Sequence, residues 1–114
     1  ERETDIYNQY GFLEEVSEWV RTACEQKYSL AFFCIQIVNL QKITEQYGWT
    51  EKDYVISGVA AAIRNVMMEY GEHIIGRVGE NEFYIVGKNK SKEEQKDIEK
   101  QVITAMNKTN RERD

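Results

Sequence analysis

The sequence predicts an α+β sandwich, in which three strands carry helices on one face. Apolar residues recur at helical intervals between residues 10 and 26, which indicates an amphipathic helix. Residues 29–38 read SLAFFCIQIV, an almost continuous run of β-branched and aromatic side chains that is typical of a strand. Residues 74–86 read IIGRVGENEFYIV, two β-rich runs around a polar turn, and this pattern predicts a β-hairpin.

In the first half of the chain, the strand at 29–38 is expected to be buried and central, because only Gln36 interrupts its apolar run. A short helix is predicted over residues 40–47, and Gly48 is expected to end it. A helix, a strand and a short helix therefore precede the long helix that follows.

Two capping boxes are predicted in the second half of the chain. Thr50 and Asp53 have the spacing at which a hydroxyl and a carboxylate satisfy free amides of a first helical turn, and so do Ser91 and Glu94. The first box is expected to open a long helix that stops near Gly71, and the second to open the last helix. The predicted hairpin lies between these two helices.

The length of 114 residues fits a single domain, and the 41% apolar and 31% charged residues are ordinary for a soluble globular protein. A net charge of −5 weighs against a nucleic-acid partner, which usually requires a basic excess. No apolar run has the length of a membrane span, and no secretory signal opens the chain. The first residue is not Met, so we expect a piece of a longer protein.

Two small groups of residues have ordinary interpretations. Cys24 and Cys34 are too few for a disulfide framework and lie among apolar neighbours, so we expect reduced, buried thiols in a cytosolic protein. Lys88, Lys90 and Lys92 form the one local basic cluster, and we expect it to be a solvated loop.

Three stretches, in order and at matching spacing, resemble the GGDEF domain family of diguanylate cyclases. ERETDIYNQYGF is similar to D-x-L-T-G-L-Y-N-R-R-G-F, IQIVNLQKITEQYGWTEKD to D-I-D-x-F-K-x-I-N-D-x-Y-G-H-x-x-G-D, and GRVGENEF to R-x-G-G-D-E-F. The chain therefore reads as a degenerate member, with GENEF in place of GGDEF. The residues kept are Thr4, Tyr7, Asn8, Gly11, Phe12, Ile37, Ile43, Tyr47, Gly48, Asp53, Arg77, Gly79, Glu82 and Phe83.

The resemblance runs from residue 1 to about residue 106 and implies a palm-like fold, similar to nucleotidyl cyclases and the ferredoxin-like arrangement. In that fold an antiparallel sheet has helices packed on it. The family continues for another helix and a strand pair, which are missing here. We therefore expect residues 1–114 to be a single GGDEF-like domain, truncated at its C-terminal end.

In active members of the family, two magnesium ions bridge the triphosphate of GTP to carboxylates on the central strand and on the hairpin. The resemblance places Gln36 and Asn81 at these two positions, and both replace a carboxylate by a neutral amide. Glu80 stands where the second glycine lets the backbone approach phosphate, so its side chain crowds and repels that ligand. Glu82 is retained. We expect no metal site and no catalytic residue, with Glu80 and Glu82 solvated.

The nucleotide contacts implied by the resemblance are also depleted. Thr44 stands at the position of the asparagine that reads guanine, whereas Asp53 and Gly79 are retained, and these three are weak candidates for a nucleotide site. Trp49 replaces a histidine beside the cleft; stacking on a base and covering apolar surface both fit it, and we favour the second. The Arg-x-x-Asp product-inhibition motif, expected at residues 70–73, is missing.

Several residues have a structural interpretation beside the functional one. For Asp53 we favour a helix cap over a contact with guanine. Arg77 is expected to pair with a neighbouring carboxylate, and His73, the single histidine, to be a surface residue without metal-binding partners. Met67 and Met68 are expected to fill the core at the end of a helix.

The expected function is that of a catalytically inactive GGDEF domain, retained as a regulatory or assembly module of a bacterial cyclic di-GMP signalling protein in the cytoplasm. Two alternatives stay open: a functional cyclase that makes cyclic di-GMP from two GTP, and a non-catalytic sensor of GTP or another nucleotide. The expected partners are other domains of the parent protein, a second copy in a homodimer, and GTP. We expect no nucleic acid, no membrane contact and no cofactor, with magnesium present only if a nucleotide is bound.

Overall fold

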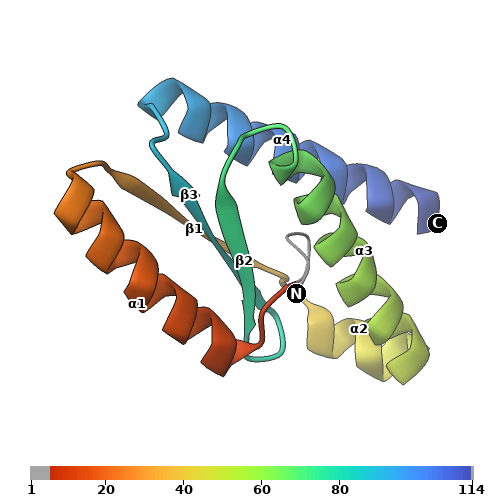
Figure 1. Cartoon of the computed structure of the whole chain (residues 1–114). Coiled ribbons are helices and arrows are strands. Elements are labelled where there is room, and N and C mark those ends of the chain that lie inside the picture. The colour runs from red at the N-terminus through yellow and green to blue at the C-terminus, as the bar shows by residue number, and fades with distance from the viewer. Residues whose placement is uncertain (1–5, 114) are drawn as a thin grey trace.

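The computed structural model describes residues 6–113, with side chains through residue 108. The order of its elements is the one that the sequence predicts: helix, strand, short helix, long helix, two strands of a hairpin, helix (Figure 1). The elements are α1 (Gln9–Gln26), β1 (Leu30–Gln36), α2 (Leu40–Tyr47), α3 (Trp49–Met67), β2 (His73–Val78), β3 (Glu82–Lys88) and α4 (Lys92–Arg113).

The three strands form one antiparallel sheet in the order β1-β3-β2. The strand at the centre is therefore β3, and the prediction that the run at 29–38 is the buried central strand is wrong. Along β1, Phe33 is buried whereas Phe32 is 58% exposed. An apolar run does not specify its neighbours, and the described residues place a strand on only one side of β1.

Helices cover both faces of the sheet, which corrects the prediction of helices on one face. α3 and α4 lie on one side and α1 lies on the other (Figure 1). The larger buried cluster lies beneath α3 and α4 and includes Ile63, Phe83 and Ile85, each with no exposed surface. A smaller cluster joins α1 to the opposite face through Phe12 and Val86, among others. The amphipathic face of α1 does pack inward, but on the opposite side of the sheet.

The N-terminal helix is held by its first residues. The side chain of Asn8 accepts a hydrogen bond of 2.8 Å from the main-chain amide of Gly11, which caps the start of α1. The main chain of Tyr7 forms an isolated parallel bridge to Gly76 of β2. A Cβ atom at Gly76 would lie 2.3 Å from ring atoms of Phe12, so the close approach of α1 to the sheet requires glycine there.

One of the two predicted capping boxes is confirmed. The amide of Ser91 donates to Glu94 Oε1 at 3.1 Å, and the amide of Glu94 donates to Ser91 Oγ at 3.0 Å, at the start of α4. The box at Thr50 and Asp53 is wrong. Gly48, with φ of 91°, ends α2 and also precedes the first residue of α3, so both side chains lie inside the helix.

Both cysteines are unpaired and exposed, so the prediction of buried thiols is wrong, although they form no disulfide. Cys34 shares the open face of β1 with Phe32, and Cys24 lies on α1 beside the buried Ala23. Neighbouring apolar letters indicated burial, but the direction of each side chain decides it. None of the described helices is both long and apolar enough to cross a membrane.

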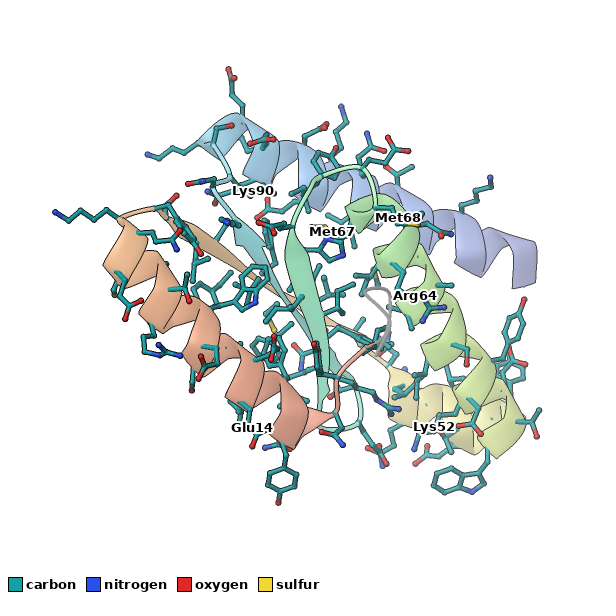
Figure 2. The ribbon with its side chains drawn as sticks, in the orientation of Figure 1. Glu14, Lys52, Arg64, Met67, Met68 and Lys90 are labelled. Carbon is teal, nitrogen blue, oxygen red and sulfur yellow. The ribbon has the colours of Figure 1, made fainter. Side chains whose placement is uncertain are left out.

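The lysine cluster and the two methionines split between core and surface (Figure 2). Lys90 is 9% exposed, and its ammonium donates a hydrogen bond of 3.0 Å to the main-chain oxygen of Lys88, so the solvated-loop prediction is wrong there. Met67 is fully buried, as predicted, whereas Met68 is 66% exposed. α3 ends at Met67, so Met68 no longer follows the inward face of that helix.

Candidate functional site

An open cleft of about 640 Å³ lies where the end of β1, the start of α2 and the β2–β3 turn meet. Residues 36–42 line one side, and Glu80 and Asn81 of the turn line the other. The structure thus brings together Gln36, Glu80 and Asn81, the three substituted positions singled out in the sequence. Gly79 begins the turn with φ of 73°, a conformation that a side chain would strain.

Asn81 ties the turn to the end of β1. Its main-chain oxygen accepts a 2.8 Å hydrogen bond from the amide of Ile37, and its side-chain Nδ2 donates at 3.3 Å to the oxygen of the same residue. The amide side chain therefore completes a two-bond link between turn and strand. A carboxylate has no hydrogen to donate, so the side-chain bond of this link depends on the amide, whereas the main-chain bond does not.

Gln36 and Glu82 are partners in the register of β1 and β3. Gln36 is exposed and Glu82 is half-buried, with the Tyr84 hydroxyl donating to Glu82 Oε1 at 3.4 Å. Interaction with Cys34, chiefly through a hydrogen bond, and repulsion from Glu82 raise the pKa of Tyr84. Glu82 is thus partly engaged with Tyr84, not simply solvated as predicted.

The side chains of Gln36 and Asn81 do not fit a pair of magnesium ions. The amides of Gln36 and Asn81 are neutral, and Mg²⁺ is held by anionic oxygens in octahedral geometry. Among residues 6–108, no three His, Cys, Asp or Glu side chains are grouped to hold a metal ion.

Glu80 carries a negative charge in the turn, and this charge is paired with a lysine. Its Oε2 lies 2.9 Å from Nζ of Lys52, which projects from the first turns of α3 (Figure 2). The same ammonium lies 4.3 Å from the centroid of the Trp49 ring. The hydrogen bond and the charge of Lys52, with a smaller effect of Arg77, lower the pKa of Glu80. Glu80 is nevertheless 70% exposed, as the prediction of a solvated carboxylate requires, and it has Lys52 as an additional partner.

Lys52 is the residue that sequence reasoning missed. It is 6% exposed, although a lysine on an amphipathic helix ordinarily reads as surface. One signal was available in the aligned motifs: Lys52 stands at the glycine of x-x-G-D, and Glu80 at the second glycine of G-G-D-E-F. Two glycines replaced by oppositely charged residues are consistent with a contact between the two positions.

The remaining predicted site residues are engaged elsewhere or exposed. The Thr44 hydroxyl donates to the oxygen of Leu40 at 2.9 Å, inside α2. Asp53 is exposed on α3, and Trp49 is 68% exposed, with its ring against an ammonium. Trp49 thus covers little apolar surface. The described hydrogen bond of Arg77 is a 2.9 Å contact from Nη2 to the main-chain oxygen of Glu80.

His73 begins β2 and is half-buried, and its Nδ1 lies 2.8 Å from the main-chain oxygen of Gly71. Its position at the start of a strand is as predicted. The prediction of a surface residue holds only in part, since the ring contacts the backbone of the preceding turn.

Residues 2–113 match the family model described as "Diguanylate cyclase, GGDEF domain". The chain belongs to the GGDEF domain family. No curated protein matched the chain.

Solved structures agree with this assignment. The GGDEF domain of TpbB (YfiN) from Pseudomonas aeruginosa is 24% identical with a TM-score of 0.80, over 94% of this chain and 62% of that one. SiaD from the same organism, solved with its activator SiaC, is 18% identical with a TM-score of 0.80, over 92% and 40%. The active GGEEF domain of a Vibrio cholerae diguanylate cyclase is 26% identical with a TM-score of 0.75, over 86% and 62%.

This GGDEF domain spans less than two thirds of each of those structures. The palm-like antiparallel fold with helices packed on the sheet is confirmed. Family membership links the domain to cyclic di-GMP signalling. The cleft is lined by the neutral amides of Gln36 and Asn81 and by Glu80, which is paired with Lys52.

Proposed function

We propose that this GGDEF domain is catalytically inactive and serves as a regulatory or assembly module of a cyclic di-GMP signalling protein. The observation that carries the proposal is the use of Asn81. The position that the family resemblance assigns to a metal carboxylate holds an amide, and that amide binds the main chain of Ile37. Gln36, at the second such position, is neutral as well.

The energetic argument follows from the charge on the metal ligands. Metal ions stabilise the transferring phosphate and help to ionise the attacking hydroxyl, an effect of several kcal/mol. Each 1.4 kcal/mol, roughly, changes a rate tenfold, so losing both anionic ligands would remove many powers of ten. The ammonium of Lys52 near the turn further opposes a divalent cation.

Turnover is the direct test. The protein is incubated with GTP and magnesium, and cyclic di-GMP is quantified. We expect none from the natural sequence. Clear turnover would overturn the proposal and favour a functional cyclase with altered ligands.

The variant Gln36→Asp, Glu80→Gly, Asn81→Asp serves as the comparison in the same assay. It restores the two anionic ligands and the open glycine together. In an altered but working cyclase, these changes raise a rate that is already measurable in the natural sequence; in an inactive domain, there is no such rate to raise.

As a module, the domain would act by docking on neighbouring domains or on a second copy. The SiaD structure was solved together with an activator, which illustrates a GGDEF-family protein acting in a complex. Two exposed, unpaired thiols are consistent with the reducing cytoplasm that we propose for it. Light scattering at increasing protein concentration tests the homodimer: a constant monomer mass would leave the neighbouring domains as its partners.

A further inference from the structure

Two lysine–glutamate pairs connect neighbouring parts of the molecule at similar separations. Lys52 Nζ lies 2.9 Å from Glu80 at the turn end of the hairpin, and Lys88 Nζ lies 2.9 Å from Glu72 at the opposite end. Both glutamate side chains are 70% exposed. The lysines differ, because the Lys52 side chain is 8% exposed and that of Lys88 is 31% exposed.

Burial makes the Lys52 ammonium dependent on its anion. A charged group withdrawn from water is costly unless an opposite charge or a set of hydrogen bonds compensates it. The contacts that provide this at Lys52 are the Glu80 carboxylate and the face of the Trp49 ring. Since Glu80 is mostly exposed, its carboxylate can turn into solvent, which would leave a buried cation beside an open cleft.

The pair also lies at the edge of the cleft, because Glu80 lines the cleft and Lys52 contacts Glu80 from α3. Lys52 directly precedes Asp53, the retained candidate for a base contact, and Glu80 stands where the backbone would approach a phosphate. A 2.9 Å contact joins the side chains of Lys52 and Glu80. A phosphate group that binds the Lys52 ammonium must displace this carboxylate from it.

The geometry points to an autoinhibitory contact: Glu80 acts as an internal anion that occupies the Lys52 ammonium and excludes the phosphate chain of a nucleoside triphosphate. This inference rests on the proposed function, because it describes how access to the non-catalytic cleft is regulated. Removal of the carboxylate exposes a cationic site that binds polyphosphate without a divalent metal. Phosphate oxygens are suitable replacements, since they accept charge-assisted hydrogen bonds from an ammonium.

Calorimetric titration with inorganic triphosphate in the presence of a chelator tests this contact. Glu80→Gln removes the charge and keeps the size of the side chain. We expect Glu80→Gln to bind triphosphate at least about tenfold more tightly than the natural sequence. A hydrogen bond to a charged group changes an affinity by about tenfold or more. The double variant Lys52→Met, Glu80→Gln is expected to lose that gain.

Glu72→Gln is the matched control, because it removes an equally exposed carboxylate from a lysine at the same distance. We expect its affinity for triphosphate to equal that of the natural sequence. A gain of less than about threefold in Glu80→Gln, or a gain that persists in the double variant or appears in Glu72→Gln, overturns the inference. Circular dichroism confirms that each variant is folded before titration.

Hydrogen exchange provides a readout that needs no ligand. Glu80→Gln and Lys52→Met should each accelerate amide exchange in the 79–81 turn, whereas Glu72→Gln should not. Unchanged exchange in both cleft variants also overturns the inference. Neither the titration nor the exchange experiment measures turnover. Cyclic di-GMP production by the natural sequence would contradict the proposed function, whereas the affinities and exchange rates of the variants decide the autoinhibitory contact.

Discussion

The two faces of the sheet are built differently, although the same three strands supply both. Consecutive residues Ile85 and Val86 of the central strand are both fully buried, one beneath α3 and α4 and the other beneath α1. At the edge strand the two faces part: Phe33 is 8% exposed beneath α3 and α4, whereas Phe32 on the opposite face is 58% exposed. α1 therefore covers β2 and β3 and reaches β1 only at Leu30, which packs against the cluster beneath α1.

The difference assigns separate roles to the two faces. The face beneath α3 and α4 is continuous across all three strands and carries the main core of the domain. The face beneath α1 carries a smaller cluster, with a close approach of helix and sheet at Gly76 and Phe12. Substitutions on the first face should therefore affect global stability, and those on the second should act mainly on the attachment of α1.

The largest expected effect separates the two neighbouring phenylalanines of β1. Phe33→Ala should lower the free energy of unfolding by about 3–5 kcal/mol, because it opens a cavity in the main core. Phe32→Ala should change it by no more than about 0.5 kcal/mol, because most of that side chain is already in water. Urea denaturation of the two variants measures both values. Equal losses would contradict the contrast between the faces.

Gly76→Ala should have an intermediate effect of about 1–3 kcal/mol, because the added methyl group overlaps the Phe12 ring. The loss of stability caused by Gly76→Ala should be smaller when Phe12→Ala is already present, because the added methyl group then meets no aromatic ring. A double-mutant cycle from urea denaturation provides this coupling. Strictly additive losses would show that the strain at Gly76 lies elsewhere.

The smallest effect concerns a contact between the segment that follows α3 and helix α4, on the better-covered face. The Tyr70 hydroxyl donates to Asp97, and this hydrogen bond, together with desolvation and nearby carboxylates, raises the pKa of Tyr70 from 10.0 to about 12. Because the folded-state pKa lies above the unfolded one, the contribution to stability is complete below pH 10.0 and is lost as pH rises toward 12.

Tyr70→Phe removes that titration. The difference in urea midpoint between the natural sequence and this variant should be constant below pH 10.0 and should shrink above it. Because the group is exposed, the difference is expected to be small. A difference that grows with pH would have the wrong sign for a hydrogen bond to Asp97.

Local patterns predicted the elements well. The reciprocal bonds of Ser91 and Glu94, the end of α2 at Gly48 and the turn at Gly79 each depend on a few adjacent residues, and all three are present. The position of β1 at an edge was not predictable in this way, because strand order is decided by which segments pair across the chain. The exposed Phe32 and Cys34 follow from that order.

In the candidate site, too, some features were predictable from the sequence and others were not. The substituted positions Gln36, Glu80 and Asn81 were visible in the motifs, and the structure gathers them in one cleft. Their partners were harder to predict, because Lys52 lies 28 residues from Glu80 and Ile37 lies 44 residues from Asn81. The replacement of two motif glycines by opposite charges was the signal for the first contact. Each partner is an unremarkable residue by itself, and only the folded sheet brings it to the turn.

The link from Asn81 to Ile37 has a consequence for how such a domain changes over many generations. A single Asn81→Asp change would remove a donor and place a negative charge beside a carbonyl oxygen before any ion is present to balance it. A lineage with this sequence would thus pass through a destabilised Asn81→Asp intermediate before it could regain a metal ligand set. The loss of the carboxylate is therefore hard to reverse one substitution at a time, and reversal requires several coordinated changes.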